Sequence, residues 1–342
     1  MNEQRAKIVW LEGPGILTFK SEPLDPPGSN EVLCETLVSA ISPGTELAAW
    51  RGDPPLRPGN PYPRLQGYCN VARVIAAGSG QDSFKPGDLV LSQQSHRSHF
   101  ATRSDDLLWK LTGTGLAPDH AASAYLFHLG YNAVLRSDMR ARHRVAVIGL
   151  GALGLGAAAM AHLGGAGEVI AITDHAAPAR IAQGYGAQTM GRADALGGAL
   201  TQSDGLAADI VILTSNAWED FALAQRIARR HATIACLGFP GRNQPPGDFN
   251  PLAAEFFYNK QLRIEAVGMA PVDNDSRGFN RFNLRDNMVH ILGLMESGRL
   301  DPAPILSGRY QARDIVQAYK DLNARKDGAI TFLLDWSGGV VG

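Results

Sequence analysis

One short segment of this sequence has the spacing G-x-G-x-x-G, and its residues are Gly149, Leu150, Gly151, Ala152, Leu153 and Gly154. The segment follows an apolar run at 144–148 that is typical of a buried strand, and it opens an Ala-rich helix predicted over 152–163. In that context the first glycine permits a tight turn, the second lets the backbone approach a pyrophosphate, and the third lets the helix pack on the strand. Because the helix N-terminus then faces the phosphates, the sequence predicts a dinucleotide site built by all six residues.

The second predicted strand of this region, 168–173, ends at a group of polar residues. Asp174 stands about 20 residues beyond the last glycine, where a carboxylate accepts both ribose hydroxyls and repels a 2′-phosphate, which favours NAD. Counting back from the Gly-Ala pair that ends the next helix places Thr173 in this position instead, followed by Asp174 and His175. Together with Arg180 these residues would accept a 2′-phosphate. The prediction is therefore NAD or NADP, with NAD preferred.

Strands and helices alternate through the middle of the chain, with predicted strands at 144–148, 168–173, 209–214 and 232–237 and a helix at 218–229 between the last two. Continuous apolar strands that alternate with helices indicate a parallel, doubly wound sheet covered on both faces. Three residues follow the last two strands and are predicted to contact the cofactor as well: Ser215, Gly238 and Phe239.

The first third of the chain is β-rich, and its predicted strands are 7–12, 15–20, 31–42, 70–77, 88–93 and 100–103. Such short strands indicate a barrel-like or sandwich-like module. Helices at 283–297 and 312–323 and a strand at 329–336 fit the parallel module poorly, so we expect them to return to the first domain. A chain of 342 residues is too long for one core. The predicted domain limits are 1–118, 119–268 and 269–342.

Bulk properties exclude several classes of function. The net charge of −1 attracts neither nucleic acid nor an anionic membrane, which leaves a small-molecule substrate as the expected partner. The first residues are charged and lack the pattern of a secretory signal, and the apolar run at 152–163 is too short to span a bilayer. Three distant cysteines, Cys34, Cys69 and Cys236, form no disulfide framework, so the expected location is the cytoplasm.

Several landmarks together resemble the medium-chain dehydrogenase/reductase superfamily over nearly the whole chain: Gly44-Thr45-Glu46, Gly67, Phe84-Lys85-Pro86-Gly87-Asp88, the glycine motif and Gly186-Ala187. Within the superfamily, the segments 41–46, 50–52, 62–63 and 67–68 are most similar to the bacteriochlorophyllide dehydrogenase branch, with threonine-dehydrogenase-like enzymes also related. The resemblance implies an α/β protein in which a Rossmann domain interrupts a GroES-like, mostly-β catalytic domain. It also implies a homodimer or homotetramer.

The residues expected to hold zinc in such enzymes are absent. Pro43 replaces a cysteine, Gly67-Tyr68-Cys69 stands where Gly-His-Glu is usual, and the third ligand position falls near Tyr125. Catalytic zinc needs three protein ligands, so we predict a zinc-free protein without metal ligands. His96 and His99 have a metal-like spacing, but on a strand they would point to opposite faces.

Without a Lewis acid, a hydroxyl or an imidazole must polarise the substrate oxygen. By resemblance the candidates are Thr45, which otherwise shapes a turn, and Tyr68 and Tyr125, which otherwise fill the vacant metal space. His99 is a further candidate, and His128 a weaker one. Glu46 is expected either to orient the nicotinamide or to form a surface pair.

The predicted function is zinc-independent, NAD(P)-dependent hydride transfer between nicotinamide and a secondary alcohol or carbonyl, as in an alcohol dehydrogenase or ketone reductase. Two alternatives stay open. One is a quinone or enoyl reductase that uses NADPH, and the other is a dinucleotide-binding protein without catalysis.

Overall fold

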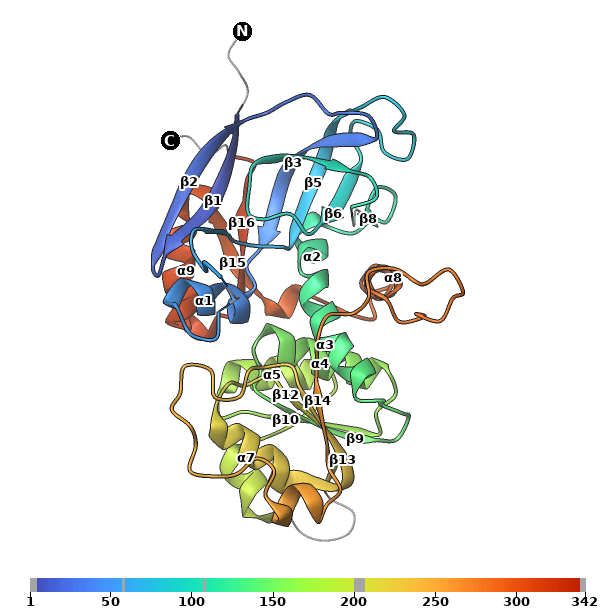
Figure 1. The fold of residues 1–342 in the computed structure, drawn as a ribbon. Coiled ribbons are helices and arrows are strands. Elements are labelled where there is room, and N and C mark those ends of the chain that lie inside the picture. The colour runs from blue at the N-terminus through green and yellow to red at the C-terminus, as the bar shows by residue number, and fades with distance from the viewer. Residues whose placement is uncertain (1–4, 57–58, 107–108, 200–206, 339–342) are drawn as a thin grey trace. The chain divides into compact units, whose positions relative to one another are not determined.

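The computed structural model describes residues 5–56, 59–106, 109–199 and 207–338, and the chain divides into two compact units (Figure 1). Unit 1 combines the chain up to Tyr125 with the chain from Met288, and unit 2 is the segment between them. The two boundaries between the units, after Tyr125 and before Met288, differ from the predicted limits of 118 and 268. Each observed boundary lies inside a helix. These helices are α3 (Ala124–Arg136) and α8 (Leu284–Glu296), whose sequences do not change in character at the boundary.

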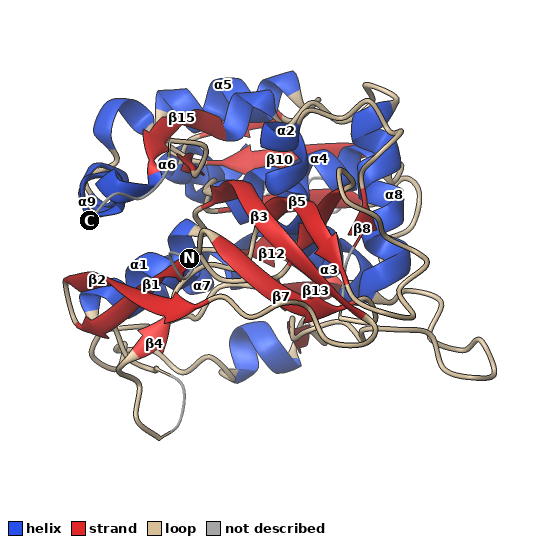
Figure 2. Cartoon of the chain, turned by 90° about the horizontal axis from the view of Figure 1, so that it is seen from above, coloured by secondary structure: helices blue, strands red, loops and turns tan. Residues whose placement is uncertain are grey.

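Unit 1 contains two β-sheets (Figure 2). The smaller has the order β2-β1-β4, formed by β1 (Arg5–Gly13), β2 (Ile16–Pro23) and β4 (Arg64–Leu65). The larger has the order β15-β16-β3-β5-β6-β8, with β7 also paired to β3. Its strands are β3 (Glu31–Ala40), β5 (Asn70–Ala77), β6 (Leu89–Ser92), β7 (His99–Arg103), β8 (Trp109–Lys110), β15 (Leu306–Gln311) and β16 (Thr331–Asp335).

The end of the chain completes the larger sheet of unit 1. β16 pairs antiparallel with β3, so that Leu333 lies opposite Ala40 and Leu334 opposite Ser39. Tyr319, from helix α9 (Ile315–Asn323), and Trp336 are buried in one cluster with Ile41 from the first segment. Two segments far apart in the sequence therefore share a single core.

The sequence patterns do not predict helix α1 (Pro43–Arg51), because they extend the preceding strand, 31–42, to the residue before the helix. The strand ends at Ala40, and Pro43 opens the helix, where its missing N–H costs nothing. Gly52 ends the helix in the left-handed conformation, with φ +79°. The other elements that the sequence patterns missed are β4, β8, α2 (Pro118–Ala122), α3, β14 (Arg263–Ala266), β15, the short α6 (Arg192–Asp194), β11 (Gln188–Met190) and the single turns Ala195–Ala199, Ala254–Tyr258, Ala303–Ile305 and Lys326–Gly328.

Unit 2 is a parallel sheet with the order β11-β10-β9-β12-β13-β14. Numbered within this unit, the order is 3-2-1-4-5-6, which is that of dinucleotide-binding folds, with the crevice at the switch point between β9 and β12. The remaining elements are β9 (Arg144–Ile148), α4 (Ala152–Leu163), β10 (Glu168–Ile172), α5 (Ala176–Gly184), β12 (Ala208–Leu213), α7 (Trp218–Ile227) and β13 (Ala228–Cys236). Within the described ranges, no helix is both long enough and apolar enough to cross a membrane.

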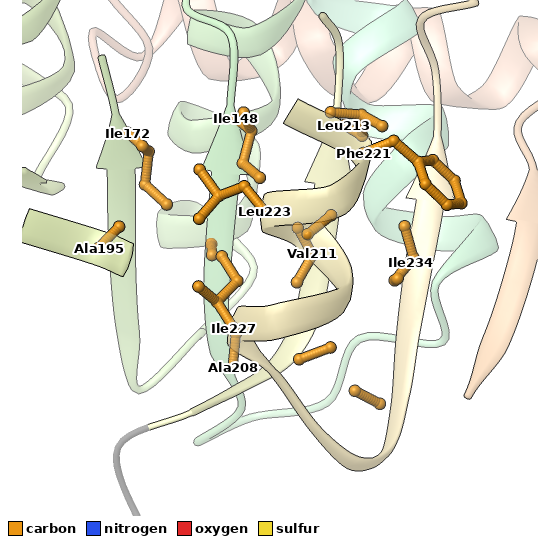
Figure 3. Close-up of a cluster of buried hydrophobic side chains, with 14 of the residues drawn as sticks. Ile148, Ile172, Ala195, Ala208, Val211, Leu213, Phe221, Leu223, Ile227 and Ile234 are labelled. Carbon is orange, nitrogen blue, oxygen red and sulfur yellow. The ribbon is translucent and has the colours of Figure 1, made fainter. Parts of the chain in front are cut away.

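Helix α7 covers one face of this sheet. Phe221, Leu223 and Ile227 project from it against strand residues such as Ile148 and Val211, and all five side chains are buried (Figure 3). This apolar contact fixes α7, and with it the loop that precedes the helix, at the carboxyl end of β12.

Helices α3 and α4 approach closely inside unit 2 because both carry a glycine. A Cβ atom on Gly130 would lie 2.4 Å from the backbone nitrogen of Ala157, and one on Gly156 would lie 3.2 Å from the Cα atom of Phe127. The backbones therefore touch at a distance that no larger residue permits.

We predict that Gly130→Ala lowers the free energy of unfolding by about 1–3 kcal/mol, because the added methyl group overpacks a backbone contact. Gly293, in the interior of α8, is the matched control, since a Cβ there meets no atom within 4 Å. Gly293→Ala should stabilise the protein by about 0.5–1 kcal/mol. Urea denaturation of both variants measures the difference, and equal effects would contradict the close approach.

Candidate functional site

The glycine motif forms the turn from β9 into α4. Gly149 has φ +88°, and a Cβ on it would lie 2.9 Å from the backbone nitrogen of Ser215. A Cβ on Gly154 would lie 1.9 Å from the carbonyl oxygen of Gly149, so the helix starts in direct contact with the turn. Gly151 is the N-cap of α4, and a Cβ there would meet no atom within 4 Å. The space in front of the helix N-terminus is therefore open, as close approach of a pyrophosphate requires.

The carboxyl ends of β12 and β13 meet this turn. The Thr214 hydroxyl donates to the Gly149 carbonyl oxygen at 2.6 Å, and the Gly238 N–H donates to the Leu213 carbonyl oxygen at 2.9 Å. A Cβ on Gly238 would lie 2.5 Å from the Ser215 carbonyl oxygen. The predicted residues Ser215 and Gly238 thus lie against each other beside the glycine turn. Thr214, which was not among the predicted residues, contacts the same turn.

Phe239, also predicted, is 52% exposed at the start of the following loop. Its N–H donates to the Asn216 side-chain oxygen at 2.8 Å, and the Arg242 guanidinium lies 4.0 Å from the centroid of its ring. Asn216 and Arg242 had no sequence signal, because neither belongs to a motif of fixed spacing.

At the end of β10 the structure brings Arg192, rather than the predicted Arg180, to Asp174. The Arg192 N–H and side chain donate to the two carboxylate oxygens of Asp174, both at 2.9 Å, and these bonds lower the pKa of Asp174. Arg192 also holds the buried Asp220 with two bonds of 2.6 and 2.9 Å. Arg180 is an exposed residue of α5. Asp174 is therefore an ionised carboxylate held in place by a fixed guanidinium.

Thr173, the other candidate for the acid's position, is buried at the end of β10. Its hydroxyl accepts a hydrogen bond of 3.2 Å from the His175 N–H. The three predicted residues 173–175 therefore form one polar turn, of which Asp174 and His175 are exposed.

In unit 1, three predicted catalytic residues lie together. The Tyr68 phenol donates to the Ser42 hydroxyl and also hydrogen-bonds with Thr45. The rings of Tyr68 and Tyr125 meet edge to face, with centroids 5.5 Å apart. Burial raises the pKa of both phenols, more strongly for Tyr68. We call Tyr68, Ser42 and Thr45 the hydroxyl cluster.

Glu46 does not form the surface pair that was one of its two expected roles. Its carboxylate is buried and accepts hydrogen bonds from the Ser42 N–H at 2.7 Å, from the Tyr319 hydroxyl and from His96 Nε2 at 2.9 Å. The sequence patterns missed Tyr319 because it lies 273 positions from Glu46.

The two histidine candidates lie on β7 and α3. His99, at the start of β7, has its Nδ1 atom 3.0 Å from the Ser98 hydroxyl, and burial lowers its pKa. His128 is a buried residue of unit 2.

The resemblance places the zinc ligands of such enzymes at Pro43, Tyr68 and Tyr125. Pro43 has no donor atom, and burial keeps the phenols of Tyr68 and Tyr125 protonated by raising their pKa. Burial also raises the pKa of the neighbouring Cys69 thiol. Across the residues that the structure describes, no group of three or more His, Cys, Asp or Glu side chains is arranged to hold a metal ion.

No family model matches the sequence. The chain is 33% identical over 84 residues to 2-desacetyl-2-hydroxyethyl bacteriochlorophyllide A dehydrogenase of Rhodobacter capsulatus, a match that covers 25% of this chain and 26% of that protein. It is 28% identical over 196 residues to L-galactonate-5-dehydrogenase of Escherichia coli, covering 49% and 56%. These matches span only about a quarter and about half of the two relatives. An alcohol dehydrogenase of Cupriavidus necator is 24% identical over 383 residues, covering 96% and 98%.

Solved structures share the fold over nearly the whole chain. Acetophenone reductase from Geotrichum candidum, in complex with NAD, has a TM-score of 0.78 at 18% identity and covers 99% of both chains. A protein described as a zinc-binding dehydrogenase, from Sinorhizobium meliloti and bound to NADP, has a TM-score of 0.77 at 20% identity, and the match covers 97% of this chain and 100% of that one. The predicted fold class is confirmed: a doubly wound Rossmann domain interrupts a GroES-like, mostly-β domain.

We predict that acid destabilises the protein through His128. Burial lowers the pKa of His128 from 6.5 to about 4, so the unfolded chain binds a proton that the folded chain refuses between these pH values. Stability is thus fully present above pH 6.5 and falls by up to about 3 kcal/mol as the pH drops to 4. Urea denaturation across this range should show a smaller fall for His128→Gln, and an equal fall would contradict the assignment.

Proposed function

We propose that this protein is a nicotinamide-dependent oxidoreductase of the medium-chain dehydrogenase/reductase type that interconverts a secondary alcohol and a carbonyl compound without zinc. The observation that carries the proposal is the open glycine turn at Gly151, in front of α4 and beside the ends of β10, β12 and β13. Relatives that are named dehydrogenases, and fold neighbours bound to NAD or NADP, support it.

The residues proposed to hold the cofactor have separate tasks. Those of the glycine turn, Gly149 to Gly154, accommodate the pyrophosphate, and Asp174 accepts the ribose hydroxyls while Arg192 keeps its carboxylate in place. Ser215, Gly238 and Phe239 border the same edge of the sheet. NAD is the preferred cofactor, because an ionised carboxylate repels a 2′-phosphate.

When bound, the nicotinamide ring supplies hydride chemistry. A side chain of this protein supplies the proton that the carbonyl oxygen receives. The Tyr68 phenol stays protonated at neutral pH and is therefore suited to donate its proton to a carbonyl oxygen. Thr45 is an exposed residue and offers a second hydroxyl in contact with the phenol. The Tyr125 ring packs edge to face against the Tyr68 ring.

The zinc-free part of the proposal rests on the donor set. Two relatives, from Haemophilus influenzae and Escherichia coli, carry the name of zinc-type alcohol dehydrogenase-like proteins. Here the corresponding positions hold Pro43, Tyr68 and Tyr125, which give zinc no ionised ligand at neutral pH. The phenol of Tyr68 is proposed to replace the metal as the group that polarises the substrate oxygen.

Fluorescence titration with NADH and NADPH tests the cofactor assignment. We expect tighter binding of NADH, and a loss of about tenfold in Asp174→Asn because a hydrogen bond to a charged group is removed. Gly151→Ala should weaken both cofactors, since its methyl group enters the open space, whereas Gly184→Ala, with no atom within 4 Å of the added Cβ, should weaken neither. Tighter NADPH, lost in Arg192→Ala, would instead assign a 2′-phosphate to Arg192.

Turnover of ketones with NADH tests the catalytic assignment. Tyr68→Phe keeps the ring contact but removes the proton, so kcat should fall by about 10²–10⁴-fold while NADH affinity stays the same. Tyr258→Phe, at a 69% exposed position, should have no effect.

Dialysis against a chelator should leave the activity unchanged. A loss that only zinc restores would refute the zinc-free assignment. Reduction of quinones or activated alkenes with NADPH, and of no ketone, would favour the reductase alternative. Cofactor binding without turnover of any of these substrates would leave a binding protein.

A further inference from the structure

A chain of buried polar side chains continues inward from the hydroxyl cluster. It links Glu46 of α1 to His96, to Ser39 of β3, to Tyr319 of α9 and to Trp336 beyond β16, and every one of these residues is buried. Helices α1 and α9 lie next to each other in unit 1 (Figure 1). None of these side chains except that of Glu46 was a candidate for a role in the reaction.

The chemistry of the groups sets the direction of the hydrogen bond at the end of this network. The Trp336 indole can only donate, so the Ser39 hydroxyl accepts its hydrogen bond at 2.9 Å. The same hydroxyl lies 2.8 Å from His96 Nδ1, and His96 Nε2 lies 2.9 Å from Glu46 Oε2. The imidazole therefore joins Ser39 of β3 to Glu46 of α1.

Glu46 also replaces the usual cap of α1. Ser42 is the N-cap residue, a position where a serine hydroxyl normally accepts a backbone N–H of the first turn, but it makes no such bond here. Instead, Glu46 Oε1 accepts the Ser42 N–H at 2.7 Å and fixes the start of the helix. The Ser42 hydroxyl is thereby available for the Tyr68 phenol.

His96 supports the Tyr68 segment from its other side. The His96 N–H donates to the Gln66 carbonyl oxygen at 2.7 Å, and the imidazole packs on Gly67, where a Cβ would lie 2.7 Å from the ring. Gly67 has φ +88°, so both its conformation and this contact require glycine. The imidazole therefore touches both the carboxylate that fixes Ser42 and the backbone that carries Tyr68.

We propose that Glu46, His96 and Tyr319 are positioning residues that hold Ser42 and the Tyr68 phenol in the geometry needed for proton donation. The chain ends at the Trp336 indole, a donor that accepts nothing, so it holds the cluster in place and does not carry protons away. This inference rests on the proposed role of Tyr68 in the reaction.

The test uses the full-length protein labelled with 3-fluorotyrosine, in which fluorine NMR reports on Tyr68 whether or not the protein turns over a substrate. The Tyr68 resonance is assigned by its loss in Tyr68→Phe. Tyr319→Phe removes only the hydroxyl that donates a hydrogen bond to Glu46, and Glu46→Gln replaces the carboxyl group with an amide. Both should shift the Tyr68 resonance and lower kcat for ketone reduction about tenfold, with KM and NADH affinity unchanged, because the proton donor is displaced.

Tyr310→Phe is the matched control. The Tyr310 hydroxyl donates to Asp321 on the same helix α9, at 2.5 Å, and not to Glu46, so its removal should change neither quantity. An unchanged Tyr68 resonance in Tyr319→Phe would overturn the inference, as would an equal shift in Tyr310→Phe. If Glu46→Gln does not fold, Tyr319→Phe decides alone. A shifted resonance in a protein that reduces no ketone would refute the proposed function and leave the positioning intact.

Discussion

The carboxylate of Glu46 is the constraint on which unit 1 depends. A buried charge is stable only where hydrogen-bond donors replace the water that it has lost. Its donors are the Ser42 N–H, His96 and Tyr319, which come from three separate segments of the chain. The hydrogen bonds of this carboxylate therefore depend on the C-terminal segment, because the Tyr319 hydroxyl comes from α9, which packs against α1.

In the proposed function, the phenol of Tyr68 takes the place that a metal ion would have. Burial raises the pKa of the Tyr68 and Tyr125 phenols and so favours their protonated form. A protonated phenol polarises a carbonyl oxygen by donating a hydrogen bond, and its strength depends on orientation far more than that of a metal ion does. If Tyr68 acts as proposed, the buried groups around it would serve to fix this orientation.

In unit 2, the shape of the proposed phosphate site depends on the backbone of the glycine turn. Its glycine turn brings the start of α4 against Gly149, and no side chain is needed to leave the space at Gly151 open. The residue proposed to bind the ribose, Asp174, is positioned by side chains instead. Arg192 holds Asp174, and the buried Asp220 holds Arg192. The proposed phosphate site thus depends on local backbone geometry, whereas the proposed ribose site depends on a network of charges.

The sequence by itself determined the elements whose cause is local. The strand 144–148, the helix 152–163 and the strand 70–77 have the predicted bounds, because period, glycine spacing and turn residues act over a few positions. It also identified the polar turn 173–175 and the candidates Thr45, Tyr68 and Tyr125, although the roles of these residues remain predictions. The pattern missed α1, because the apolar positions of β3 continue up to Pro43 without a visible break.

Only the tertiary structure decided which partners these residues have. Arg192 rather than Arg180 lies at Asp174, and Glu46 is buried against Tyr319 instead of forming a surface pair. Each of these contacts joins residues whose separation along the chain follows no period. A hydrogen bond between positions 273 apart has no local signature, since it exists only after the sheets have brought the two segments together.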